Sequence, residues 1–183
     1  MFKNRPRLKN FDYKGHCRYF ITICTHDKVQ LFRDNILVEQ LIKALRDKSD
    51  VFGFKVWAFC FMPDHLHLLL EGKSTDSDLR RFISSFKQYT GYHFKKKVAQ
   101  GVSPEGLKPC ATVSNKKGVV QGFSPAPSRL WQASYYDHVL RKEEDIMDVA
   151  RYILNNPVRK GLATHFMEYK HTGSFELDIE ELF

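Results

Sequence analysis

The sequence predicts an α+β domain with a ferredoxin-like antiparallel sheet, two helices packed on it and an added C-terminal helix. Three runs rich in aromatic, aliphatic and β-branched residues, at 18–26, 54–62 and 65–71, are typical of strands. Only Pro63 and Asp64 separate the last two runs, so these strands must be antiparallel neighbours joined by a tight turn. With three helical patterns and a fourth strand, described below, the order of elements is strand, helix, strand, strand, helix, strand, helix.

The two helices that should cover the sheet are recognised by their apolar repeats. Residues 35–48 place their apolar residues on one side of a helix, at Leu37, Leu41, Ile42 and Leu45. A longer helix is predicted over 76–97, with an N-terminal cap supplied by residues 74–77. Its buried side is formed by Leu79, Phe82, Ile83 and Phe86.

The chain ends with a fourth strand and a third helix. The strand is predicted over 134–141 and the helix over 143–155, where three acidic residues complement the positive end of the helix dipole. Pro157 disfavours helical geometry at Asn156, so the helix should end there. The acidic tail that follows is expected either to fold back on basic surface or to stay loose.

In this topology the first and third strands are the central ones. Successive side chains of a strand point to opposite faces of the sheet. Leu66, Leu68 and Leu70 should therefore pack on the first two helices. His65 and His67 then share the other face, where the last helix can approach.

Length and composition favour a single domain over residues 1–183, because 43% hydrophobic residues can build a substantial core. The formal net charge of +8 favours polyanionic partners such as nucleic acid. The four cysteines lack zinc-type spacing, and the three in or next to predicted strands are interpreted as small buried apolar residues. The sequence has no secretory leader pattern and no apolar run that could span a bilayer, which predicts a cytoplasmic setting.

Two segments fall outside this scaffold. Residues 1–17 are interpreted as a basic arm, in which Arg5 and Arg7 are candidates for phosphate contacts. A solvated, flexible terminus is the alternative. Residues 99–129 hold four of the seven prolines and four of the ten glycines, which predicts a long loop with little regular structure and leaves a DNA-touching role open.

The predicted helix 76–97 has a basic side interleaved with Tyr89 and Tyr92. Such a side is usually solvated surface. In a basic protein it is also a candidate for holding a nucleic-acid backbone, with bases stacked on the tyrosines. The cations that we select as DNA-contacting candidates are Arg80, Arg81, Lys87 and Lys95.

His65 and His67 are the strongest candidates for chemistry. Their spacing presents two imidazoles side by side from one rigid strand, an arrangement that can give a divalent metal two nitrogen ligands. Asp64 could orient one ring by accepting a hydrogen bond from its second nitrogen. The alternative is a pair of histidines on a half-buried strand that satisfy their own hydrogen bonds.

Two motifs and the segments between them resemble one protein family. Residues 62–69, MPDHLHLL, are similar to the histidine–hydrophobic–histidine signature of the HUH endonucleases, as carried by the insertion-sequence-200-like single-tyrosine transposases. Residues 152–162, YILNNPVRKGL, resemble the tyrosine-bearing helix of the REP-associated tyrosine transposases, a branch of that family. Residues 130–132 and 135–141 also resemble this branch, so the likeness extends from about residue 19 to residue 162.

The resemblance implies a metal-dependent enzyme that nicks and joins single-stranded DNA near hairpins through a covalent 5′-phosphotyrosine. It implies that Tyr152 is the nucleophile and that the metal ligands are His65, His67 and Asn156, a position where relatives can use glutamine or another polar residue. Two histidine nitrogens and an amide oxygen suit Mg²⁺ or Mn²⁺. His138 is similar to a family histidine on the strand before the last helix, with a structural hydrogen bond as the alternative role.

Two other functions are left open. One is a domesticated DNA hairpin-binding protein without transposition activity, although the presence of all four implied site residues favours the enzyme. The other is a metal hydrolase that attacks with water, which would nick DNA without a covalent protein–DNA product. The resemblance to the REP-associated branch favours a monomer over a homodimer.

Overall fold

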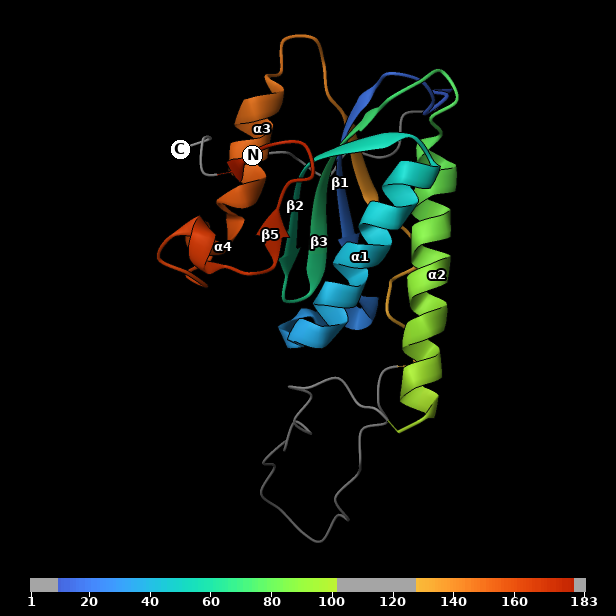
Figure 1. The fold of residues 1–183 in the computed structure, drawn as a ribbon, viewed down its shortest axis with the longest axis vertical. Coiled ribbons are helices and arrows are strands. Elements are labelled where there is room, and N and C mark those ends of the chain that lie inside the picture. Colours follow the sequence, from blue (N-terminus) through green and yellow to red (C-terminus); the bar gives the residue numbers. More distant parts are fainter. Residues whose placement is uncertain (1–9, 102–127, 180–183) are drawn as a thin grey trace, which may run out of the picture.

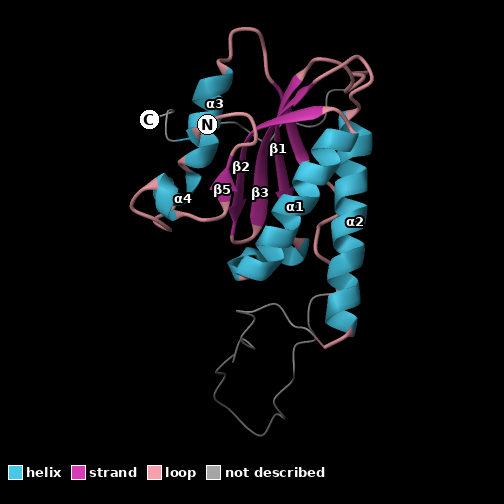
Figure 2. Cartoon of the chain, viewed as in Figure 1, coloured by secondary structure: helices cyan, strands magenta, loops and turns pink. Residues whose placement is uncertain are grey.

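A five-stranded antiparallel sheet lies at the centre of the computed structural model, which describes residues 10–101 and 128–179 (Figures 1 and 2). The strand order is β4-β1-β3-β2-β5, so β1 and β3 are central, as predicted. The short edge strand β5 was not predicted. The strands are β1 (Arg18–Cys24), β2 (Phe54–Met62), β3 (His65–Gly72), β4 (Tyr136–Val139) and β5 (Thr172–Gly173).

Helices cover both faces of the sheet. Helices α1 (Asn35–Val51) and α2 (Leu79–Ala99) lie on one face, and α3 (Ile146–Leu154) and α4 (Asn156–Arg159) lie on the other (Figure 1). Short 3₁₀ helices are found in the connections, at His26–Lys28, Leu31–Arg33 and Phe166–Glu168. The predicted α+β class is therefore confirmed.

Two hydrophobic clusters correspond to the two faces. Leu66, Leu68 and Leu70 of β3 are fully buried in the cluster that includes α1 and α2. The cluster on the other face joins Phe20 and Leu69 of the sheet to the apolar side of α3. This alternation confirms the predicted orientation of β3.

An aspartate immediately before the first residue caps the N-terminus of each of helices α1 and α2. Asp34 accepts a hydrogen bond of 3.0 Å from the backbone of Leu37, and Asp78 accepts one of 3.0 Å from the backbone of Arg81. The prediction that residues 74–77 cap α2 was therefore wrong. The hydroxyl of Ser77 instead donates to the carbonyl of Gly53 at 2.6 Å, so it holds the turn before α2 against the start of β2.

The described part of the expected basic arm, residues 10–17, is anchored in the core at Tyr13, while Asn10, Asp12, Lys14 and His16 are exposed. Tyr13 is fully buried and its hydroxyl donates to Asp137 at 2.5 Å. The segment has few aliphatic residues, so its burial depends on aromatic rings that the hydropathy pattern does not reveal. Arg5 and Arg7 lie outside the described residues, as do residues 102–127 of the expected long loop.

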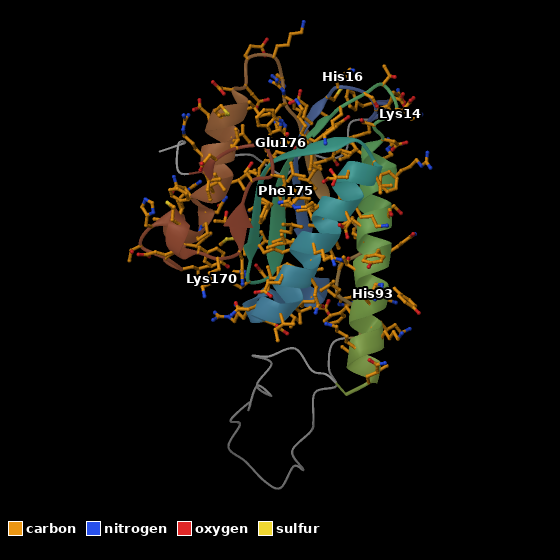
Figure 3. All side chains as sticks on the ribbon, viewed as in Figure 1. Lys14, His16, His93, Lys170, Phe175 and Glu176 are labelled. Carbon is orange, nitrogen blue, oxygen red and sulfur yellow. The ribbon has the colours of Figure 1, made fainter. Side chains whose placement is uncertain are left out.

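The described part of the acidic tail folds back on the domain. Strand β5 pairs with β2 through Phe59 and Gly173. The ring of Phe175, labelled in Figure 3, then packs on Phe59 with ring centroids 5.2 Å apart. The guanidinium of Arg46 lies 4.0 Å from the Phe175 centroid. An aromatic contact, rather than the tail's charges, fixes this part of the chain.

Gly72 at the end of β3 should not tolerate a side chain. A Cβ at this position would lie 1.9 Å from the carbonyl oxygen of Gly15. We expect Gly72→Ala to lower the free energy of unfolding by about 2 kcal/mol, because backbone must move to relieve the overlap. Gly91→Ala is the matched control, since its Cβ would enter open space on α2 and should raise stability by about 0.5–1 kcal/mol. Equal effects in urea unfolding would contradict this packing.

Candidate active site

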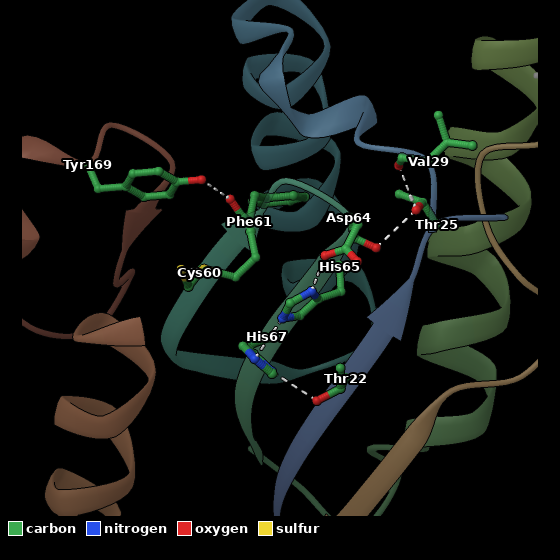
Figure 4. Close-up of polar contacts among 10 residues, drawn as sticks. Thr22, Thr25, Val29, Cys60, Phe61, Asp64, His65, His67 and Tyr169 are labelled. Carbon is green, nitrogen blue, oxygen red and sulfur yellow. Dashed lines mark hydrogen bonds and ion pairs between the residues drawn. The ribbon is translucent and has the colours of Figure 1, made fainter. Parts of the chain in front are cut away.

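The turn that introduces the histidine strand is fixed by hydrogen bonds from two loops. The backbone N–H of buried Thr25 donates to the carbonyl of Asp64 at 2.9 Å, and its hydroxyl lies 2.9 Å from the same oxygen (Figure 4). The backbone N–H of Phe32 donates to the carbonyl of Pro63 at 3.0 Å. These contacts define the position of Asp64 before β3 begins.

His65 and His67 point toward each other on the α3 face of the sheet (Figure 4). Their Nε2 atoms are 3.1 Å apart, and the rings are nearly perpendicular. The outer nitrogens have separate partners. Nδ1 of His65 lies 2.6 Å from a carboxylate oxygen of Asp64, as expected, and Nδ1 of His67 lies 2.9 Å from the hydroxyl of Thr22.

These partners bear on the hydrogen-bond roles of the ring nitrogens. A carboxylate accepts hydrogen bonds, so the contact with Asp64 favours Nδ1 of His65 as the donor and leaves its Nε2 directed at His67. Burial, and secondarily the neighbouring His65, lowers the pKa of His67 to about 3. His67 is therefore neutral at physiological pH, which is the form that binds metals.

The histidine pair fits a divalent cation. Metal–imidazole bonds of about 2.0–2.1 Å let two nitrogens bind one ion at close to a right angle when they are as near as these two Nε2 atoms. The contacts to Asp64 and Thr22 are the outer hydrogen bonds that orient histidine ligands in metal sites. Within residues 10–101 and 128–179, no group of three His, Cys, Asp or Glu side chains could hold a metal ion. From the described part of the chain, further ligands would therefore be amide oxygens, completed by water or DNA oxygens.

Asn156 is brought near Tyr152 by a turn between two helices. Helix α3 ends at Leu154, and Asn156 begins α4 with Pro157 in its first turn. The prediction that Pro157 excludes helical geometry at Asn156 was wrong, because proline is tolerated at the start of a new helix.

The side chain of Asn156 is buried and caps α3. Its amide nitrogen donates to the carbonyl of Tyr152 at 3.0 Å and contacts that of Ile153 at 3.4 Å. Among the described residues, the hydrogen bonds of Asn156 do not reach His65 or His67. A metal-ligand role for its side-chain oxygen stays a prediction.

Tyr152 lies on the same face of the sheet as the histidines. Its ring packs edge-to-face on Phe20 of β1 with centroids 6.2 Å apart, and Phe20 lies 5.4 Å from the ring of His67. Phe20 thus lies between the ring of Tyr152 and the ring of His67. Sequence reasoning missed both Phe20 and Thr22, because their places beside Tyr152 and His67 depend on strand register.

His138 also projects on this face, because it pairs directly with Phe20 across β1 and β4. Its Nε2 lies 2.9 Å from both carboxylate oxygens of Glu144, which also accepts a hydrogen bond from the backbone of Arg141. This arrangement ties β4 to the turn before α3. The contact with Glu144 is consistent with the structural alternative for His138, and its role in the site stays a prediction.

The basic candidates on α2 lie on the opposite face of the sheet from the histidines. The ammonium group of Lys87 donates to the carbonyls of Gln132 and Ala133 at 2.9 Å each, so it anchors the segment before β4. The guanidinium of Arg80 lies 4.8 Å from the ring centroid of Tyr13.

Two other cations of α2, Arg81 and Lys95, are exposed. Lys95 borders a groove of about 560 Å³ together with exposed Tyr92 and Arg129. A DNA-binding role for these residues stays a prediction. No helix in the described part of the chain is long and apolar enough to cross a membrane.

Comparison with known proteins identifies the family. Residues 13–104, half of the chain, match the family described as "Transposase IS200 like". The chain therefore belongs to the IS200-like transposases, a family of DNA-processing enzymes.

Two of the proteins similar to this chain carry the name of the REP-associated tyrosine transposases. A Haemophilus influenzae protein assigned by name to the REP-associated tyrosine transposases is 22% identical over 162 residues, covering 88% of this chain and 81% of that protein. An uncharacterised H. influenzae protein is 25% identical over 166 residues, covering 83% and 86%. A solved structure of a REP-associated tyrosine transposase bound to a REP hairpin superposes with a TM-score of 0.61 at 17% identity, covering 92% of this chain and 82% of that one. This superposition supports the α+β fold described above.

The metal site can be tested by calorimetric titration with Mn²⁺. We expect His65→Ala combined with His67→Ala to abolish binding, and Asp64→Asn to weaken it about 10–100-fold by releasing the His65 ring. His93→Ala is the control, because this histidine is exposed on α2. Unchanged affinity in the double variant would remove the metal site.

The depressed pKa of His67 should make stability depend on pH. In unfolded chain His67 regains a pKa near 6.5, so below that pH the unfolded state binds a proton that the folded state excludes. The free energy of unfolding should fall as the pH drops from about 6.5 toward 3, by at most about 1.4 kcal/mol per pH unit. Urea unfolding in chelator should show a flatter dependence for His67→Gln. Parallel curves for the two proteins would contradict the burial of a neutral ring.

Proposed function

We propose that this protein is a metal-dependent endonuclease and strand transferase that nicks single-stranded DNA beside a hairpin and forms a covalent 5′-phosphotyrosine at Tyr152. The observation that carries the proposal is the common position of the two reactive elements. The converging Nε2 atoms of His65 and His67 and the half-buried ring of Tyr152 lie on one face of the sheet, joined through Phe20. Membership of a transposase family supports the reaction class.

The chemistry follows from the reactivity of a phosphodiester, whose negative charge repels nucleophiles. A divalent cation held by His65 and His67, Mg²⁺ or Mn²⁺ by the choice of ligands, would neutralise charge on a non-bridging phosphate oxygen. Asp64 and Thr22 keep the two rings oriented toward a common point. This preorganisation avoids the cost of ordering the ligands during the reaction.

The phenol oxygen of Tyr152 attacks phosphorus, and the bond from phosphorus to the 3′ oxygen of the preceding nucleotide breaks. The proton lost by the phenol is balanced by the proton gained by the leaving 3′ hydroxyl. The new phosphotyrosine bond conserves the energy of the phosphodiester, so a second strand end can displace the tyrosine without ATP.

The partner we propose is single-stranded DNA that carries a hairpin. The structural relative was solved with a REP hairpin, and the net charge of +8 favours a polyanion. On α2 the exposed Arg81 and Lys95 could contact phosphates, and Tyr92 could stack a base. We propose that the protein acts as a monomer, because the histidines and the tyrosine of one site come from one chain.

Tyr152→Phe should abolish both cleavage and the covalent adduct while it preserves hairpin affinity. Phenylalanine keeps the ring that packs on Phe20 and loses the attacking oxygen. Tyr136→Phe is the matched control, since Tyr136 is an exposed tyrosine on the same face, directly paired with Thr22. Denaturing gels of labelled hairpin DNA with Mn²⁺ measure both products. Cleavage by Tyr152→Phe without an adduct would favour attack by water, and stable binding by wild type without cleavage would favour the hairpin-binding protein.

Contact of α2 with phosphates should appear in the salt dependence of binding. We expect affinity to fall steeply with salt, and Lys95→Ala and Arg81→Ala each to flatten the log–log slope by about one unit. Lys73→Ala is the control, because Lys73 is already paired with Asp50 at 3.9 Å. Identical slopes for all four proteins would place the DNA elsewhere on the surface.

A further inference from the structure

We infer that Arg159 is a second catalytic residue, whose guanidinium binds the phosphate that Tyr152 attacks; this rests on the proposed function of Tyr152. The guanidinium carbon of Arg159 lies 4.5 Å from the centroid of the Tyr152 ring, over its face. This places a permanent positive charge beside the candidate nucleophile. Sequence reasoning included Arg159 in the tyrosine motif and gave it no role.

The backbone path from α3 into α4 places Arg159 beside Tyr152. The chain turns at Asn155 and starts α4, and the buried amide of Asn156 ties α4 to the carbonyl of Tyr152. Gly161 ends α4 with a positive φ of 67°, and the N–H of Leu162 donates to the carbonyl of Pro157 at 2.9 Å. The short helix is therefore held at both ends, with Arg159 on the tyrosine side.

Arg159 is available for an anionic ligand. It is exposed, and among the described residues no carboxylate forms an ion pair with it. Arg151 on α3 is different, because it pairs with Asp148 at 3.0 Å. The stacking of Arg159 on the half-buried Tyr152 ring is weaker than an ion pair, so the guanidinium can move from the ring to a phosphate without breaking a strong contact.

The chemistry of the step requires such a group. As the phenol oxygen attacks and the 3′ oxygen leaves, negative charge builds on both non-bridging oxygens of the phosphate. A cation at the histidine pair would neutralise one of them, and the planar N–H fork of an arginine suits the other. Arg159 neither gains nor loses a proton, so the balance of the transfer from Tyr152 is unchanged.

The first arm of the test is the single-turnover cleavage rate at saturating protein, with hairpin DNA and Mn²⁺. We expect Arg159→Ala to slow adduct formation at least about 100-fold, as is typical when a charge-stabilising donor is removed. Arg159→Lys should fall between this variant and wild type, because it keeps the charge and loses the fork. Lys160→Ala is the matched control, an exposed cation at the next position, and should react at the wild-type rate.

A second arm separates phosphate binding from mere positioning of the Tyr152 ring. The two stereoisomers of a methylphosphonate at the cleaved linkage each replace one of the two charged oxygens with a methyl group, and they are tested separately. If Arg159 binds the phosphate, one isomer should slow wild type and Lys160→Ala strongly and should slow Arg159→Ala much less. Equal slowing in all three proteins with both isomers, or an unchanged rate in Arg159→Ala on unmodified DNA, would overturn the inference and leave Tyr152 as the nucleophile. Cleavage by wild type without any adduct would overturn the proposed function itself, and the inference with it.

Discussion

The antiparallel register between β1 and β3 is the constraint on which the site depends. It pairs Thr22 with His67 and Phe20 with Leu69. One face of these strands then builds the core with α1 and α2, and the other presents the histidines with their neighbours. A slip of one residue would exchange the two faces, burying imidazoles in the core and exposing leucines. The fully buried leucines of β3 therefore stabilise the orientation of the site as well as the fold.

Much of this arrangement could be predicted from the sequence, because it depends on local patterns. The alternation of leucine and histidine in β3 and the two-residue turn at Pro63 and Asp64 each have one simple structural solution. The predicted bounds of β2 match the observed Phe54–Met62. The buried side of α3 likewise follows a helical period, at Ile146, Val149, Ala150 and Ile153.

The remaining features depend on contacts between distant segments, which local patterns do not encode. Thr22 and Phe20 became site residues only once strand register was known. The burial of Tyr13 depends on Asp137, far along the chain. The short helix α4 after Asn155 was not predicted, and the turn at Asn155 is what places Arg159 over Tyr152.

The site joins rigid elements of different kinds. Strand β3 supplies the two imidazoles, and hydrogen bonds with Asp64 and Thr22 orient them. Helix α3 supplies Tyr152, whose ring packs on Phe20. The exposed cations of α2 lie on the far side of the sheet. The proposed cleavage site therefore lies on the α3 face of the sheet, and the proposed additional DNA contacts lie on the α2 face.

Pulsed electron paramagnetic resonance of Mn²⁺ tests the central claim most directly. The sample is the Tyr152→Phe protein with hairpin-bearing single-stranded DNA, in which bound DNA is not cleaved. We expect magnetic coupling of the manganese to two imidazole nitrogens and to a DNA phosphorus. Coupling to nitrogens without phosphorus, or tightly bound manganese without coupling to imidazole nitrogen, would contradict a common site for the histidine pair and the reacting phosphate.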